Sequence, residues 1–156
     1  MKTVWSAAFA LTVVATAFGA TQASAQQQFE YAVKFVCGKA APPNGVAAGF
    51  YFTLINVHNP GTVTVEFRKK FARAMPNQKP DKITQLFGAV LKADEVFGVE
   101  CMEITQRLGL APGSFVDGVA VFITPRELDV IAVYTASATQ TGPLVTLHTE
   151  RVPKRP

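Results

Sequence analysis

Hydrophobic and polar residues alternate along most of the chain after residue 28, and the repeat is two residues. An extended strand has this period because successive side chains point to opposite faces. In the clearest stretch, residues 29–37, one face carries Phe29, Tyr31, Val33, Phe35 and Cys37, while Glu30, Ala32 and Lys34 lie on the other. This stretch predicts a half-buried strand with Cys37 on its buried face.

Similar stretches, separated by turn residues rich in Gly, Pro and Asn, predict further strands. They cover residues 50–58, 62–72, 83–91, 96–101, 115–124, 128–136 and 144–152. Both faces of the strand at 50–58 are apolar, so we expect it to lie centrally in its sheet. The turn residues at 59–61 predict a hairpin with the strand at 62–72, and those at 125–126 predict another between 115–124 and 128–136. Residues 102–108 form the only expected short helix.

About eight short strands with a turn roughly every ten residues are typical of one architecture. We therefore expect an all-β, antiparallel β-sandwich that is immunoglobulin-like in the broad sense. A closed barrel is the alternative.

The N-terminal residues have the pattern of a secretory signal peptide. Lys2 precedes an apolar stretch at residues 4–18, and Ala23-Ser24-Ala25 forms a small-x-small cleavage pattern. A membrane anchor is the alternative, although a spanning helix needs about 20 apolar residues. The sequence thus predicts a signal peptide at 1–25, a β-sandwich at 26–152 and a frayed basic tail at 153–156. We expect export to the periplasm or the extracellular space.

The charge of the chain is mildly basic. The 156 residues include 15 Lys and Arg against 11 Asp and Glu, and cleavage would remove only Lys2, which leaves 14 − 11 = +3. This balance favours an anionic partner over a cationic one. We expect no nucleic-acid partner, because dense basic clusters interleaved with aromatic residues are missing from the sequence.

The chain has two cysteines, Cys37 and Cys101, and both fall on the predicted buried faces of their strands. In an oxidising compartment such a pair is usually one disulfide. The bond would close a loop of about 65 residues and contribute roughly 4 kcal/mol by the chain-entropy relation. Two buried free thiols are the alternative.

No catalytic, cofactor-binding or metal-binding residues are predicted. The sequence contains neither a Gly-x-Ser-x-Gly elbow nor a glycine-rich phosphate loop, and its two histidines are isolated. Two alternatives stay open. An enzyme or enzyme subunit would build its site near His58, Asn56 and Glu66, and a weak metal carrier would use His58 and His148.

The densest charge cluster comprises Arg68, Lys69, Lys70 and Arg73, and it is the candidate binding patch. Strict alternation turns Lys69 inward, between two phenylalanines. A β-bulge could shift the phase there, or Lys69 could be an inward-pointing charge that blunts an edge strand. The functional interpretation is a basic strip for an anionic protein, lipid or polysaccharide surface. Residues 118–124 and 129–135 are apolar on nearly every position, which indicates either central strands or an exposed apolar face.

Five segments carry a family resemblance. They are Phe35-Val36-Cys37-Gly38, Thr53-Leu54-Ile55-Asn56-Val57-His58-Asn59-Pro60, Phe67-Arg68-Lys69-Lys70, residues 91–101, and Leu128-Asp129-Val130-Ile131-Ala132-Val133-Tyr134-Thr135. Together they resemble a group of small exported bacterial β-sandwich proteins of unknown function. The strand-and-turn patterns at 56–65 and 91–95 are also similar to those of bacterial immunoglobulin-like accessory domains. The resemblance implies one exported β domain and no particular chemistry.

These observations lead to one main hypothesis on function. We expect an exported, non-enzymatic domain that binds a partner or associates with a surface through its sheet edges and loops.

Overall fold

The computed structural model describes residues 28–42, 45–75, 78–79 and 83–155. The predicted signal peptide lies outside the described residues. The described part is nearly all β, with eight strands and one short helix. The strands are β1 (Phe29–Ala40), β2 (Gly49–His58), β3 (Val65–Arg73), β4 (Phe87–Leu91), β5 (Val96–Glu100), β6 (Val116–Thr124), β7 (Asp129–Ser137) and β8 (Val145–Arg151).

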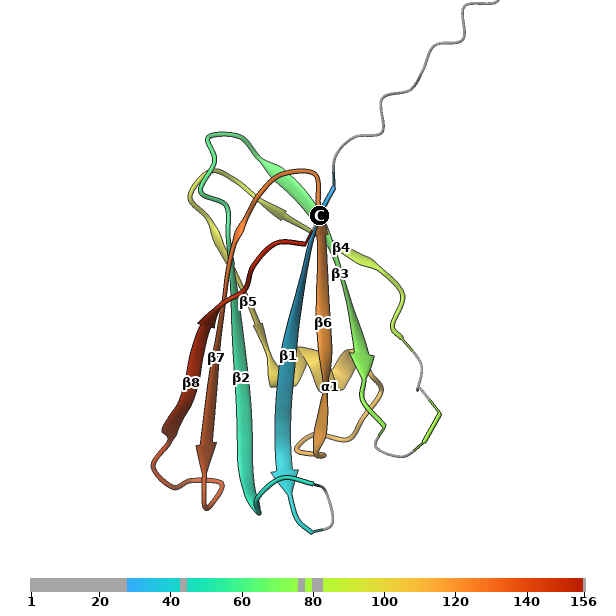
Figure 1. Cartoon of the computed structure of the whole chain (residues 1–156), viewed down its shortest axis with the longest axis vertical. Coiled ribbons are helices and arrows are strands. Elements are labelled where there is room, and N and C mark those ends of the chain that lie inside the picture. Colours follow the sequence, from blue (N-terminus) through green and yellow to red (C-terminus); the bar gives the residue numbers. More distant parts are fainter. Residues whose placement is uncertain (1–27, 43–44, 76–77, 80–82, 156) are drawn as a thin grey trace, which may run out of the picture.

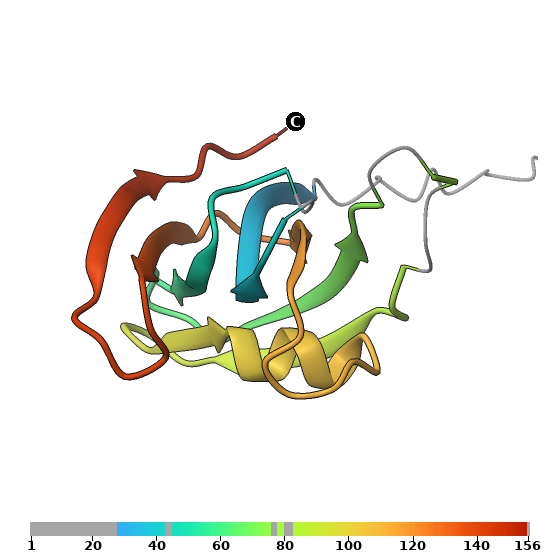
Figure 2. The ribbon, with the colours of Figure 1, turned by 90° about the horizontal axis from the view of Figure 1, so that it is seen from below.

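The strands form an antiparallel sandwich (Figure 1). One layer has the order β4-β3-β6-β1, and the other places β2 between β7 and β5, with β8 beyond β7. Strand β1 belongs to both layers, because Phe29–Cys37 pair with β6 whereas Gly38–Ala40 pair with β2. The sheet does not close, which confirms the predicted sandwich and excludes the barrel. In Figure 2, β5 and α1 (Cys101–Arg107) lie on one side of the curved row of strands.

Both predicted hairpins are wrong. Strand β2 pairs with β1, β5 and β7, whereas β3 pairs with β4 and β6. Strand β6 pairs with β1 and β3, whereas β7 pairs with β2 and β8. Each of these connections crosses from one layer to the other, so the apolar faces of consecutive strands meet across the core instead of side by side. Turn residues show where a strand ends, but they do not select its hydrogen-bonding partner.

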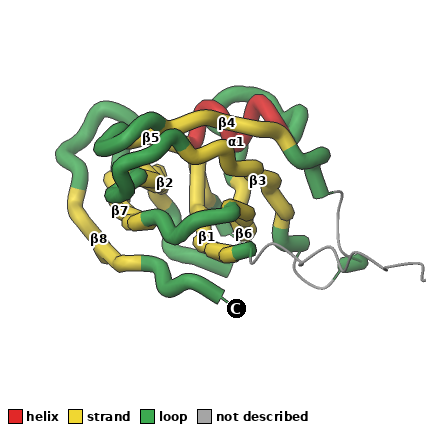
Figure 3. The backbone as a smooth tube through the Cα atoms, turned by 90° about the horizontal axis from the view of Figure 1, so that it is seen from above, coloured by secondary structure: helices red, strands yellow, loops and turns green. Residues whose placement is uncertain are grey.

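The core is aromatic. Phe67 contacts Phe97 of the opposite layer and Phe122 of the adjacent strand, and Phe35 contacts Phe71 edge-to-face. The helix predicted at 102–108 is confirmed as α1 (Cys101–Arg107), and its Ile104 is fully buried. In Figure 3, α1 lies beside β4 and β5, on the side away from the C-terminus. Within the described residues, no helix is long and apolar enough to cross a bilayer.

Beyond its short contact with β2, one edge of β1 has no neighbouring strand among the described residues. Side chains from the other layer supply hydrogen-bond partners for the backbone groups of this edge. The Thr53 hydroxyl accepts from the Val36 N–H and donates to the Val36 carbonyl, at 2.9 Å in both cases. The Tyr134 hydroxyl lies 3.0 Å from the Lys34 carbonyl oxygen and shares its single proton between this oxygen and Glu150 Oε1, which is 2.6 Å away. These bonds complete the backbone pairing where β2 and β1 separate.

The C-terminal tail supplies hydrogen-bond partners for the same edge of β1 near its N-terminal end, at Glu30. The Arg155 N–H donates to the Glu30 carbonyl at 2.7 Å, and the Glu30 N–H donates back at 3.5 Å. Val152 is buried, and Lys154 forms an ion pair with Glu127. In the tail that the sequence predicts to be frayed, Arg155 thus has backbone partners on the open edge of β1, and Lys154 has a side-chain partner.

Candidate functional site

Lys69 lies in the core and not on the surface of the predicted basic strip. Strand β3 keeps a regular register with both neighbours, so no bulge shifts its phase. Lys69 is 1% exposed, which confirms the inward-pointing charge. It does not blunt an edge, because β3 lies between β4 and β6.

Burial of Lys69 is compensated by a carboxylate and by aromatic rings. Its Nζ lies 2.7 Å from Oε1 and 2.9 Å from Oε2 of Glu103 on α1. The same ammonium lies 3.8 Å from the ring centroid of Phe97 and 5.2 Å from that of Phe87. Burial lowers the pKa of Lys69, while the Glu103 carboxylate opposes this shift. The pair joins the helix to the first layer from inside.

The other residues of the basic strip are distributed differently. Arg68 is exposed and Lys70 is half-buried, and alternation places both on the outer face of β3. Arg73 is half-buried at the end of the strand. Arg68 also lines a cavity of about 640 Å³ with Glu66, Val90 and Ile123. The accessible part of the strip is thus Arg68 and Lys70, with Arg73 near its end.

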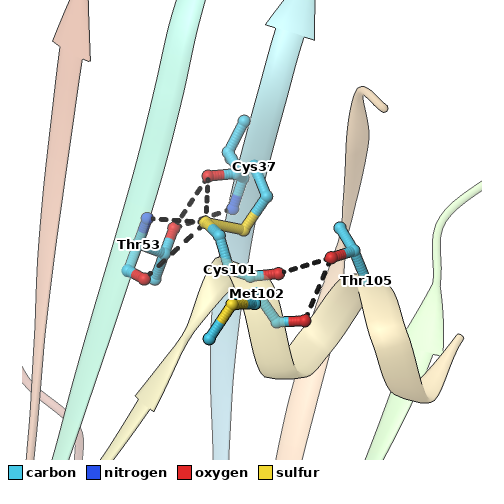
Figure 4. Close-up of a disulfide and its surroundings, with 6 residues drawn as sticks. Cys37, Thr53, Cys101, Met102 and Thr105 are labelled. Atoms are coloured by element: carbon cyan, nitrogen blue, oxygen red, sulfur yellow. Dashed lines mark hydrogen bonds between the residues drawn. A yellow bond between two sulfur atoms is a disulfide. The ribbon is translucent and has the colours of Figure 1, made fainter. Parts of the chain in front are cut away.

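The disulfide forms between Cys37 and Cys101, with a Cα–Cα distance of 5.5 Å (Figure 4). It links β1 to the first residue of α1. The Thr53 N–H points at the Cys101 sulfur from 3.1 Å. The sulfur also lies 3.8 Å and 3.7 Å from the carbonyl oxygens of Val36 and Thr53, and because it carries no proton these are contacts, not bonds that it donates. The Cys37–Cys101 disulfide thus lies at the point where β1 and β2 separate, and it holds the two strands there.

The residues of the enzyme alternative do not come together. Asn56 lies on the outer face of its layer, opposite Gly98 and Ile131 of the neighbouring strands. Glu66 is exposed on the outer face of the other layer. His58 lies 3.5 Å from Asp129 and 3.9 Å from Asp94, so its partners are acids that were not predicted.

The two histidines also lie apart, on opposite faces of the β2–β7–β8 layer. His58 pairs in register with Asp129, whose side of β7 faces outward, whereas His148 stacks on Tyr134, whose side faces inward. In the part of the chain that the structure describes, no three His, Cys, Asp or Glu side chains gather in a way that could hold a metal ion.

A groove between β1 and β8 is the strongest candidate site, and we call it the β1–β8 groove. It encloses about 340 Å³ and is lined by aliphatic, aromatic and charged side chains: Lys34, Val36, Val46, Tyr51, Phe52, Tyr134, Thr135, Leu147, His148 and Glu150. Its volume falls within the range of small-molecule sites. The lining comes from four strands and the loop before β2.

The groove lies where β8, the last strand of its sheet, extends past β1 (Figure 3). The inward side chains of β7 and β8 there line one cavity with Lys34 and Val36 of β1. The register of β7 and β8 shifts between Tyr134 and Thr135, which leaves Leu147 as an extra residue in β8. This bulge brings the neighbouring side chains of Leu147 and His148 into one lining.

Tyr134 organises the polar end of the groove. Its hydroxyl lies 2.6 Å from Glu150 Oε1 and 3.0 Å from the Lys34 carbonyl, and its ring stacks on His148 at 6.1 Å between centroids. Burial, followed by the hydrogen bond to Glu150, raises the pKa of Tyr134 well above its ordinary value. The phenol therefore stays protonated and acts as a hydrogen-bond donor, which suits binding better than proton abstraction.

This groove is not apparent from the sequence, in which His148 is an isolated histidine and neither Tyr134 nor Glu150 has a predicted role. The alternation of β8 places Thr146, His148 and Glu150 in one phase, which was the available indication. The partners on β1 and β7 become visible only once the strand order is known.

Comparisons with known proteins are limited to structure. No family model matches the chain, and no curated protein matches it. Among solved structures, a Thermotoga maritima protein, described as Thermotoga maritima 1070, is similar with a TM-score of 0.47 and 9% sequence identity. The similarity covers 81% of this chain and 91% of that one.

Proposed function

We propose that this chain is an exported, non-enzymatic binding domain whose ligand lies in the β1–β8 groove. The observation that carries the proposal is the uncovered inner face of β7 and β8, which supplies an apolar floor beside converging polar groups. The disulfide supports export, because such bonds persist in oxidising compartments.

The lining favours an amphipathic organic ligand. Leu147, Val36 and the Tyr134 ring provide apolar surface. The stacked rings of Tyr134 and His148 provide a flat surface against which a ring or an aliphatic chain of the ligand can pack. Glu150 stands at the polar end and can accept a hydrogen bond from the ligand, whereas the Lys34 ammonium lies 2.9 Å from Asp117 and is paired with it. A ligand with an apolar body and one neutral polar end fits this arrangement best.

The experiment is a ligand-observed NMR screen of the domain from residue 26, using amphipathic fragments and saturation transfer. Leu147→Asp should abolish the transfer, because it places a charge on the apolar floor. Val90→Asp is the matched control, since Val90 is 55% exposed and Leu147 56% exposed, and both lie on end strands of the sheet. Equal loss in both variants, or hits that are insensitive to both, would contradict the proposal.

Arg68 and Lys70 are a second candidate surface, for an anionic partner. The favouring observation is that Arg68 lines the cavity of about 640 Å³ on the outer face of β3 and β4. Binding to anionic vesicles that disappears in the double variant Arg68→Glu and Lys70→Glu, and in high salt, would support it. Binding that survives both would assign the anionic contact elsewhere.

A further inference from the structure

A second cavity lies beside the disulfide and is separate from the site proposed above. It encloses about 680 Å³, which is within the range of small-molecule sites. Its lining combines the disulfide and uncharged polar residues with four apolar side chains, which are Phe52, Met102, Leu110 and Pro112. We call it the Met102 cavity. Figure 4 shows Met102 next to the disulfide.

The walls of the Met102 cavity are fixed by covalent and backbone links. The disulfide joins β1 to α1, and the Leu110 N–H donates to the Thr105 carbonyl at 2.9 Å. The Lys39 N–H donates to the Gly113 carbonyl at 3.1 Å, which ties the loop after α1 to β1. Gly38 permits this approach, since its φ is 84° and a Cβ there would lie 2.1 Å from the carbonyl oxygen of the adjacent loop. A ligand would therefore enter a preformed site, with little ordering cost.

The polar groups of the Met102 cavity are all neutral. None of the described residues that line it is charged, whereas Lys34 and Glu150 line the β1–β8 groove. The side-chain amides of Gln106 and Gln140 line the cavity from two different loops or elements, and neither has a hydrogen-bond partner among the described residues. Each amide offers both a donor and an acceptor to a ligand.

Thr105 adds an acceptor of fixed direction. It is 7% exposed, and its hydroxyl lies 2.9 Å from the Cys101 carbonyl oxygen and 3.1 Å from that of Met102. These two carbonyls share its single proton, so its oxygen can only accept from a ligand. The cavity thus combines apolar surface with neutral donors and acceptors.

We propose that the Met102 cavity binds a neutral sugar ring of an oligosaccharide. The C–H face of such a ring packs on Phe52 and Met102, because positively polarised C–H groups are attracted to an aromatic face. Its hydroxyls both donate and accept, as the amides of Gln106 and Gln140 require. A hydrocarbon chain would leave the amides without partners, and an ionised ligand would find no counter-charge in the lining. Met102 is 71% exposed, so the cavity is open there to the rest of the saccharide chain.

The test is a titration of the labelled domain from residue 26 with maltotriose, cellotriose and triacetylchitotriose, followed by amide correlation spectra. At least one of these neutral sugars should give saturable shifts at Met102, Gln106, Gly113 and Gln140. Gln106→Ala and Gln140→Ala should each weaken binding about fivefold, because each removes one or two hydrogen bonds. Gln85→Ala is the matched control, since Gln85 is also an exposed glutamine but does not line the cavity.

The remaining outcomes separate this proposal from the one above. Leu147→Asp, which should abolish fragment binding in the β1–β8 groove, should leave sugar binding unchanged. Absence of saturable shifts with all three sugars would overturn the proposal, and so would equal weakening in Gln85→Ala. Shifts at Tyr134 and His148 instead would assign the sugar to the groove. Saturable shifts at Met102 with octanol but not with sugars would make the cavity an apolar site.

Discussion

At the scale of single residues, Lys69 shows how far alternation along a strand can be trusted. Its inward direction follows from its place between Phe67 and Phe71, so this part was predictable from the sequence. Its partner was not, because Glu103 approaches from a helix that is 34 residues away in the sequence. Alternation defines the face of a residue but not what packs against that face.

The asymmetry of the Lys69–Glu103 pair leads to a prediction on stability. Glu103→Gln leaves a buried ammonium without a counter-charge and should lower the free energy of unfolding by about 3 kcal/mol. Lys69→Met fills a similar volume with apolar atoms, and the remaining Glu103, whose side chain is 24% exposed, stays hydrated. We therefore expect Lys69→Met to stay within about 1 kcal/mol of the wild type, or above it. Urea unfolding measures both, and equal losses would contradict a dominant desolvation cost.

Tyr134 predicts how stability changes in alkali. Its pKa is raised above 10.0 in the folded protein, so above that pH the unfolded chain releases a proton that the folded chain keeps. The stability that this group contributes is complete below pH 10 and is lost as the pH rises further. Tyr31 acts in the same direction, whereas the lowered pKa of Lys69 acts in the opposite one.

Tyr134→Phe separates this contribution from the others. The urea midpoint of the wild type should fall more steeply between about pH 9 and about pH 11 than that of the variant. Parallel curves would mean that Tyr134 titrates alike in the folded and unfolded chains.

At the scale of elements, the sequence predicts positions well and pairings poorly. Eight strands and the helix lie where periodicity places them, although β4 begins only at Phe87, after an isolated bridge between Ile83 and Ala72. The hairpins were wrong because adjacent apolar strands can bury their faces side by side or across a core, and short turns permit both. The disulfide was predictable, since the phase of each strand put both cysteines inside.

Asn59 connects elements in a way that can be tested. Its side chain is buried, and its amide nitrogen lies 2.8 Å from the Val63 carbonyl, 3.2 Å from that of Leu91 and 2.9 Å from that of Lys92. Its amide oxygen accepts from the Gly61 N–H at 3.1 Å. One side chain thus holds the end of β2 against the turn between β4 and β5.

Asn59→Asp should destabilise the domain more than Asn59→Ala does. The aspartate turns an oxygen toward carbonyls that need donors and buries a charge, so we expect a loss of about 3 kcal/mol or more, against about 2 kcal/mol for alanine. Chemical denaturation gives the order of the two variants. An aspartate variant as stable as the wild type would mean that the amide nitrogen does not make these bonds.

At the scale of the whole molecule, the candidate site depends on long-range geometry. The β1–β8 groove combines residues from β1, β2, β7 and β8, which come together only through the strand order. Composition and motifs do not report strand order. The densest charge cluster is visible in the sequence, but its central lysine lies in the core.

The most direct test of the proposed function is to map where a ligand binds. Amide proton–nitrogen correlation spectra would be recorded for the labelled domain with increasing amounts of the strongest fragment from the screen. The account predicts saturable shifts concentrated at Lys34, Val36, Tyr134, Leu147 and His148, with little change at Val90 or Met102. Shifts concentrated instead at the cavity beside Met102, or at the outer face of β3 and β4, would contradict the assignment of the β1–β8 groove as the binding site.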